Sequence, residues 1–202
     1  TPTVEGGLNR GVWALKDPHG AGSGHEREWI LKLVRGARTV PSLLTEAENF
    51  LKIAQDHPTI STDPAVAFPT ALLGCLGSDG SKRHDLIVMT RVHGGRLAEI
   101  IAQRWYAGQH AELWQIMEKV GACIAAFHAR YSNTQHSDFQ PSNVFWDEDS
   151  GCVHLIDVGG MGVPTSDNDV EHFIHALQLL SRSYGPQFEA ESIRAFRAGY
   201  DG

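Results

Sequence analysis

The chain has 202 residues, of which 42% are hydrophobic and 20% are charged, as in an ordinary globular protein. Seventeen basic residues against 24 acidic ones give a formal net charge of −7, so we expect no sequence-independent binding to nucleic acid phosphates. No apolar run approaches the length of a membrane-crossing helix, and the three scattered cysteines suggest neither a metal site nor a disulfide set. These features predict a cytoplasmic protein with no membrane partner.

The first part of the chain, residues 1–92, predicts a β-rich lobe with one helix. Short apolar runs are separated by glycine-rich turns, and the first two runs are typical of a hairpin. The strands are expected at Val12–Leu15, Trp29–Val34, Val66–Leu76 and Asp85–Val92. From Leu43 to Gln55 the apolar residues recur at helical spacing, which predicts a helix there.

The second part, residues 93–202, predicts a mainly helical lobe. Apolar residues recur every three or four positions along three stretches, which indicates helices with one buried face. The helices are expected at Ala111–Arg130, Asp169–Tyr184 and Glu189–Tyr200, and two short strands at Asn143–Trp146 and Val153–Ile156. A β-rich part followed by a helical one is an α+β layout of two lobes.

The most informative segment is His136-Ser-Asp-Phe-Gln-Pro-Ser-Asn143, followed by a strand that ends in Asp157-Val-Gly-Gly. Phosphoryl transfer needs hard oxygen ligands for a divalent cation and a carboxylate that orients the attacking hydroxyl. Asp138 and Asn143 lie five residues apart on one loop and can divide these tasks. A strand–turn–strand could return Asp157 to Asn143, and the glycines at 159–160 would let the chain turn sharply away.

This pattern, His-x-Asp-x-x-x-x-Asn and then Asp-x-Gly, resembles the catalytic loop and metal-binding motif of protein kinases and their relatives. It is most similar to the atypical and small-molecule branch, such as aminoglycoside and choline phosphotransferases and RIO-like kinases. The resemblance implies a two-lobed protein-kinase-like fold that transfers the γ-phosphoryl group of ATP with Mg²⁺. By position it makes Asp138 the catalytic base, Asn143 and Asp157 the metal ligands, and His136 a structural prop.

The resemblance also implies a strand lysine that contacts nucleotide phosphates and pairs with a helix glutamate. Lys32 fits this role, because apolar strand residues flank it and its burial would be costly without an anionic partner. Glu46 is the preferred partner on helical phase, and Glu48 is the alternative. Lys32 could instead be an edge-strand lysine that faces solvent.

Two further nucleotide contacts follow from the resemblance. A loosened glycine-rich loop would cover the phosphates with backbone N–H groups, although a plain turn fits equally well. The end of the strand at 85–92 resembles the interlobe hinge that faces adenine. The loop residues are Gly6, Gly7, Gly11 and Val12, and the hinge residues are Met89, Thr90 and Val92.

The pattern departs from that of protein kinases in ways that bear on the acceptor. Gln140 stands where many of them have a lysine that contacts the transferred phosphate. Only 12 positions separate Asp157 from Asp169, too few for the usual activation loop. A small-molecule hydroxyl acceptor is therefore preferred over a protein Ser/Thr acceptor. The alternatives are a pseudokinase scaffold without turnover and an enzyme that transfers AMP.

Two features near the last motif have ordinary explanations beside functional ones. Asp169 opens a predicted helix, where it would cap the positive end, and a further role in bracing the catalytic loop is equally open. His172 and His175 lie one turn apart on that helix, but no third ligand is near them in sequence, so a zinc site is not expected.

Overall fold

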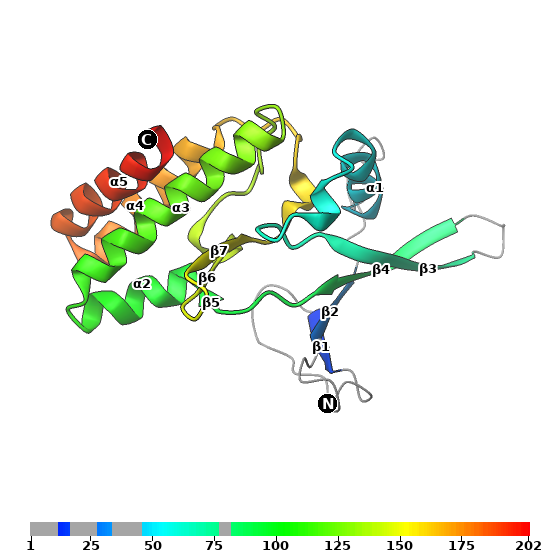
Figure 1. Cartoon of the computed structure of the whole chain (residues 1–202), viewed down its shortest axis with the longest axis horizontal. Helices are drawn as coiled ribbons and strands as arrows, with labels where there is room; N and C mark the ends of the chain where they lie inside the picture. Colours follow the sequence, from blue (N-terminus) through cyan, green and yellow to red (C-terminus); the bar gives the residue numbers. More distant parts are fainter. Residues whose placement is uncertain (1–11, 17–27, 34–45, 77–81) are drawn as a thin grey trace. The chain divides into compact units, whose positions relative to one another are not determined.

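Figure 1 shows the computed structural model of the chain, which describes residues 12–16, 28–33, 46–76 and 82–202. The chain forms two compact units. The first ends at Val92 and the second begins at His93, except that the short segment Pro64–Val66 belongs to the second unit.

Within the described residues of the first unit, four strands form an antiparallel sheet in the order β1-β2-β4-β3. The strands are β1 (Val12–Lys16), β2 (Glu28–Leu33), β3 (Pro69–Leu76) and β4 (Lys82–Thr90). The predicted pairing of the first two strands is confirmed, with Val12 opposite Lys32. β2 therefore lies inside the sheet and not at its edge.

Helix α1 (Glu46–Asp56) follows β2 and is the helix predicted from residues 43–55, the first three of which lie outside the described ranges. Its buried residues recur at helical spacing, and Phe50 packs edge-on against Phe68 with ring centres 5.4 Å apart. A short 3₁₀ turn, η2 (Ile60–Thr62), then leads toward β3.

The strand predicted from Val66 begins at Pro69 instead. Val66 forms an isolated parallel bridge with Leu155, and the Leu155 N–H donates to the Ala65 carbonyl oxygen at 2.7 Å. The apolar residues at 66–68 are therefore not one continuous strand with β3, because the backbone at Ala65–Val66 pairs within the second unit.

Among the described residues of the second unit, three short strands form an antiparallel sheet: β5 (Gly95–Arg96), β6 (Val144–Asp147) and β7 (Cys152–Leu155). The last two are the strands predicted around the catalytic motif. The turn between them places Gly151 at φ 65°, a conformation that favours glycine.

The helices of the second unit are α2 (Leu97–Tyr106), α3 (His110–Arg130), α4 (Asp169–Tyr184) and α5 (Pro186–Asp201). The three predicted helices are confirmed, and α5 begins three residues early, at a proline that suits the first helical position. Helix α2 was not predicted, although Leu97, Ile100 and Ile101 are spaced for one buried face. No helix in the described ranges is long and apolar enough to cross a membrane.

Helices α3 and α5 run alongside each other (Figure 1) and approach so closely that their backbones touch. A β-carbon on Gly121 of α3 would overlap the Phe196 carbonyl oxygen, and one on Gly199 of α5 would overlap the Glu118 carbonyl oxygen. The two glycines therefore allow a crossing that no larger residue permits.

We predict that Gly121→Ala destabilises the protein by about 1–3 kcal/mol, because the added methyl group forces α5 away from α3. Thermal and urea unfolding of purified protein would measure the change. Ala126→Ser, at an exposed site of the same helix, serves as the control and should change stability little. An alanine variant as stable as the wild type would contradict the direct backbone contact, since helix propensity alone favours alanine.

Candidate active site

The predicted catalytic loop, residues 136–143, is anchored to the core of the second unit by Phe139. This side chain is fully buried, and its ring stacks on Phe173 of α4 with centres 4.7 Å apart. Phe173 in turn lies against Phe196 of α5, with centres 4.6 Å apart. Because Phe139 is packed in the core, the backbone at its neighbours Asp138 and Gln140 is held in place.

The Asp138 carboxylate is oriented by two neutral amides. The Asn143 Nδ2 donates to Asp138 Oδ2 at 2.8 Å and to the Asp138 carbonyl oxygen at 2.9 Å. The Gln140 Nε2 donates to Asp138 Oδ1 at 2.8 Å. Each carboxylate oxygen has two lone pairs, so these bonds fix the group and still leave capacity to accept a proton or a hydroxyl.

Asn143 and Asp157 are brought together by the strands that follow the loop. Val144 pairs with Leu155 across β6 and β7, and the Ile156 N–H donates to the Asn143 carbonyl oxygen at 3.0 Å. The predicted return of Asp157 to Asn143 is therefore confirmed at the level of the backbone.

The sharp turn after β7 does not use Gly159 and Gly160 as predicted. These residues belong to the 3₁₀ turn η4 (Val158–Gly160), and neither has a positive φ. The left-handed residues are Asp157, at φ 63°, and Gly162, at φ 76°. Aspartate tolerates this region better than most residues, so the turn is made by the proposed metal ligand itself.

The oxygens at this point suit a hard cation such as Mg²⁺. The Asn143 amide nitrogen is used on Asp138, so Oδ1 is the atom of this side chain that could bind a cation, and Asp157 could add a carboxylate. Magnesium needs only one or two protein ligands when phosphates and water supply the rest. Among the described residues no group of three or more His, Cys, Asp or Glu side chains could hold a metal, and a site of this kind does not require one.

A buried carboxylate on α4 braces the catalytic loop. Asp169 is 1% exposed, and its oxygens accept from the His136 N–H at 2.6 Å, the Ser137 N–H at 2.9 Å and the His128 Nε2 at 2.9 Å. Burial raises the pKa of Asp169, but the hydrogen bond from His128 and those from the two amides outweigh it, and the net pKa is lowered.

The further bracing role for Asp169 is therefore confirmed, whereas the expectation that it is the helix cap is wrong, because Asp169 is the first helical residue and lies one position after the cap. Asn168 is the cap: its side chain accepts from the Glu171 N–H at 2.9 Å, and Glu171 accepts from the Asn168 N–H in return. The Asp169 N–H donates instead to Gln135 Oε1 at 2.8 Å.

His136 is fully buried beneath the loop. Its Nε2 lies 2.9 Å from the Ile156 carbonyl oxygen, an acceptor, so Nε2 carries the proton. Its Nδ1 accepts from the Asp138 N–H at 3.4 Å. Burial lowers the pKa of His136, against the opposing effects of Asp169, the Ile156 carbonyl and two further carboxylates. A neutral ring that joins the loop to the residue directly after β7 matches the structural prop implied by the motif.

In the first unit, Lys32 of β2 forms an ion pair with Glu46, the first residue of α1, with Nζ and Oε1 2.5 Å apart. The two side chains are 13% and 15% exposed. The solvent-facing alternative for Lys32 is therefore wrong. Glu46 rather than Glu48 is the partner in this pair, and Glu48 is exposed.

The remaining predicted nucleotide contacts are only partly within the described ranges. Gly6, Gly7 and Gly11 lie outside them. Val12 opens β1 opposite Lys32. Among the hinge residues, Met89 is buried and Thr90 is exposed at the end of β4, and Val92 is the last residue of the first unit.

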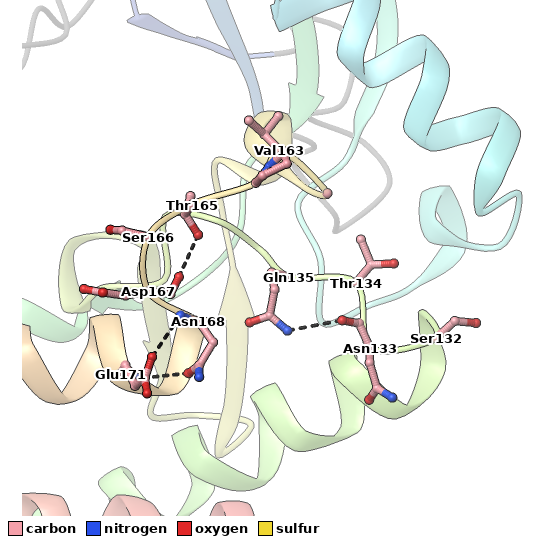
Figure 2. A pocket seen from close by; sticks show the side chains of 12 residues that line it. Ser132, Asn133, Thr134, Gln135, Val163, Thr165, Ser166, Asp167, Asn168 and Glu171 are labelled. Atoms are coloured by element: carbon pink, nitrogen blue, oxygen red, sulfur yellow. Dashed lines mark hydrogen bonds between the residues drawn. The ribbon is translucent and has the colours of Figure 1, made fainter.

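A polar pocket of about 610 Å³ lies beside the catalytic loop (Figure 2). It is lined by residues 132–135, residues 162–168 and Glu171. One lining segment is tied to the loop, because the Ser137 Oγ donates to the Val163 carbonyl oxygen at 2.8 Å. The two segments are tied to each other by the Gly162 N–H, which donates to the Gln135 carbonyl oxygen at 2.9 Å. No lysine or arginine is among the described residues that line it.

Sequence reasoning missed this pocket. Apart from residues 162–164, its lining consists of residues with hydroxyl, amide and carboxylate side chains, and these also bond to the backbone, as Gln135 does to the Asn133 carbonyl oxygen (Figure 2). The signal available was the density of such residues at 132–135 and 165–168, which in the sequence is also typical of plain loops.

The family model described as the lipopolysaccharide kinase (Kdo/WaaP) family matches residues 62–200, more than half of the chain. The chain belongs to the lipopolysaccharide kinase (Kdo/WaaP) family. This match runs from the last residue of η2 to the last but one of α5 and includes the catalytic loop, Asp157 and Asp169. It confirms the expected protein-kinase-like superfamily.

Two individual proteins resemble this Kdo/WaaP-family chain. A probable serine/threonine-protein kinase of Dictyostelium discoideum is 26% identical over 132 residues, which is 64% of this chain and 10% of that protein. The kinase PK-1 of the Cydia pomonella granulovirus is 15% identical, with a TM-score of 0.50, over 95% of this chain and 64% of that one. The chain thus spans about a tenth of the Dictyostelium protein and about two thirds of the viral kinase. The second likeness confirms the kinase-like α+β fold.

We predict that the unfolding free energy falls as the pH drops below the ordinary histidine pKa of 6.5, in part because of His136. Its folded-state pKa is lowered, so the unfolded chain binds the proton first and is favoured by acid. The contribution of His136 to the unfolding free energy is fully present above pH 6.5. As the pH falls from 6.5 to the folded-state pKa, this contribution is lost by at most about 1.4 kcal/mol per pH unit.

Urea unfolding from neutral pH to about pH 5.5 would measure this slope in the wild type and in His136→Gln. The glutamine variant should be less stable at neutral pH but should lose stability less steeply. His175→Gln, at an exposed position, should keep the wild-type slope. Equal slopes for wild type and His136→Gln would show that His136 is not held neutral.

Proposed function

We propose that this Kdo/WaaP-family chain is an ATP- and Mg²⁺-dependent phosphotransferase that moves the γ-phosphoryl group to a hydroxyl, with a small molecule as the acceptor. The observation that supports this most is the Asp138 carboxylate, held by two amide donors on a loop that a buried carboxylate braces. A catalytic group fixed in this way meets the main demand of phosphoryl transfer, which is positioning.

In this mechanism Asp138 orients the acceptor hydroxyl and takes its proton. The hydroxyl oxygen bonds to the γ-phosphorus while the bond from that phosphorus to the β–γ bridging oxygen breaks, and ADP leaves with the electron pair. Gln140 and Asn143 hold the carboxylate by hydrogen bonds and bring no formal charge to it.

The charge of the phosphates requires cationic partners. Asn143 Oδ1 and the Asp157 carboxylate would hold Mg²⁺, which when bound neutralises the charge of the transferred group and of the leaving ADP. Lys32, kept in place by Glu46, would contact the nucleotide phosphates. Gly6, Gly7, Gly11 and Val12 would cover the phosphates, and Met89, Thr90 and Val92 would face the adenine.

A small hydroxylated acceptor is favoured over a protein by two observations. Only 12 positions separate Asp157 from Asp169, too few for the usual activation loop on which a peptide would dock. The pocket beside the loop has a volume within the range of about 300–1,000 Å³ typical of small-molecule sites. Its hydroxyl and amide side chains match the hydroxyl groups of a saccharide, the acceptor class that the family's name suggests. A protein Ser/Thr acceptor is the second candidate, supported by the name of the Dictyostelium relative.

Substitutions of the two aspartates should separate binding from transfer. We expect Asp157→Ala to abolish the Mg²⁺-dependent rise in melting temperature that ATP produces, because a metal ligand is lost. Asp138→Asn should keep that rise and lower kcat by about 10²–10⁴-fold, because only the base is lost. Thermal shift and ADP release would measure the two effects.

Normal turnover by Asp138→Asn would disprove the assigned mechanism, and the absence of any ATP-dependent shift in the wild type would favour a pseudokinase scaffold. Release of pyrophosphate instead of ADP would indicate AMP transfer.

The acceptor pocket can be tested by blocking it. The acceptor for this test is the neutral sugar that most stimulates ADP release. We expect Ser166→Trp to raise the KM for that sugar about tenfold, which corresponds to the loss of one or two hydrogen bonds, and to leave the KM for ATP unchanged. Ser183→Trp, exposed on α4 and outside the pocket, is the matched control. An unchanged KM for the sugar in Ser166→Trp would remove the pocket from the proposal.

A further inference from the structure

A chain of hydrogen bonds joins the last helix to the catalytic loop. The Tyr200 hydroxyl of α5 lies 3.1 Å from His128 Nδ1 on α3. The other ring nitrogen of His128, Nε2, lies 2.9 Å from Asp169 Oδ2 on α4. That same carboxylate accepts from the His136 and Ser137 N–H groups, immediately before Asp138. These hydrogen bonds thus link three helices and end beside the proposed base.

The chemistry of these groups determines which atom donates and which accepts in each hydrogen bond. The Asp169 carboxylate is an acceptor, so His128 must carry its proton on Nε2. In the neutral ring, Nδ1 then holds a lone pair and needs a donor, which the Tyr200 hydroxyl supplies. His128 is only 4% exposed, so water is a poor substitute for that donor. The hydroxyl therefore satisfies the nitrogen that is left as an acceptor in the tautomer that donates to Asp169.

Tyr200 is held in place by the close crossing of α3 and α5. A β-carbon on Gly121 would lie 2.8 Å from the Tyr200 backbone nitrogen, so the backbone of α5 is seated directly on α3 at this residue. One turn earlier on α5, Phe196 is fully buried against Phe173. The phenol ring also packs edge-on against His128, with ring centres 5.8 Å apart. The packing of the α5 backbone and of the phenol ring therefore fixes the position of the hydroxyl.

We propose that Tyr200 is a positioning residue for the catalytic loop, acting through His128 and Asp169 on the amides that precede Asp138. Its role rests on the proposed phosphotransfer, in which the placement of Asp138 determines the rate. Tyr200 contacts no reacting atom in this scheme. Removing its hydroxyl lowers the rate of the chemical step and leaves nucleotide affinity unchanged.

The test uses Tyr200→Phe, which removes one oxygen atom and keeps the ring, with Tyr106→Phe, a 76% exposed tyrosine, as the matched control. Hydrolysis of Mg·ATP with water as the acceptor gives kcat and the KM for ATP. We expect kcat to fall about fivefold, the effect of one lost hydrogen bond, with KM unchanged. On a His128→Gln background the same substitution should have no further effect, since the two residues act in series.

Hydrogen exchange of the His136 and Ser137 amides provides a readout that needs no activity. Both amides should exchange faster in Tyr200→Phe, while the amides of β6 and β7 keep their wild-type rates. An active wild type with unchanged kcat and unchanged exchange in Tyr200→Phe would overturn the proposal, as would faster exchange spread evenly over the second unit. An inactive wild type with faster exchange confined to the two amides would overturn the proposed function and support the positioning role of Tyr200.

Discussion

The geometry of the candidate active site depends on one buried carboxylate. Asp169 accepts from two successive backbone amides and from His128, and each of these bonds satisfies a group that burial would otherwise leave costly. Ser137, one of the two amides, has φ 72°, a conformation that costs a non-glycine residue roughly 1–2 kcal/mol. Charge-assisted hydrogen bonds offset that cost, so the loop keeps a backbone shape that its own sequence disfavours.

The neutral character of the groups around Asp138 distinguishes this loop from those that carry a lysine at the position of Gln140. An amide can orient a carboxylate but cannot share the charge of a transferred phosphoryl group. In the proposed mechanism that charge is left to Mg²⁺ and to Lys32. The absence of lysine and arginine from the described lining of the pocket points the same way, because an acceptor that bound as proposed would meet dipoles and carboxylates from these residues.

Parts of the fold could be predicted from the sequence because their signals are local. Helices α3 and α4 follow from apolar spacing, and the choice of Glu46 as the partner of Lys32 follows from helical phase within one turn. The motif from His136 to Asp157 is recognisable because its residue types and spacing are those that the chemistry requires. The short helix α2 has the same apolar spacing, but it directly follows a glycine-rich segment that also suits a hinge.

The features that sequence reasoning missed arise from contacts between distant residues. Asp169 lies more than thirty residues from the amides that it accepts, and its position in the first turn of a helix gives an ordinary capping residue as the simpler explanation. The choice between Asp169 and Asn168 as the cap depends on which side chain the tertiary structure turns inward. The pocket likewise exists only because hydrogen bonds join residues 162–163 to residues 135–137.

The contact of backbones at Gly121 and Gly199 also restricts how the end of the second unit can change in length. Each residue added to or removed from a helix rotates everything beyond it by about 100°. An insertion within α5 ahead of Phe196 would turn both that ring and Tyr200 away from their partners and place a side chain where Gly199 meets α3. Between α4 and α5 only Gly185 is available to absorb such a change. The register of the last helix is therefore fixed as firmly as that of a strand in a sheet.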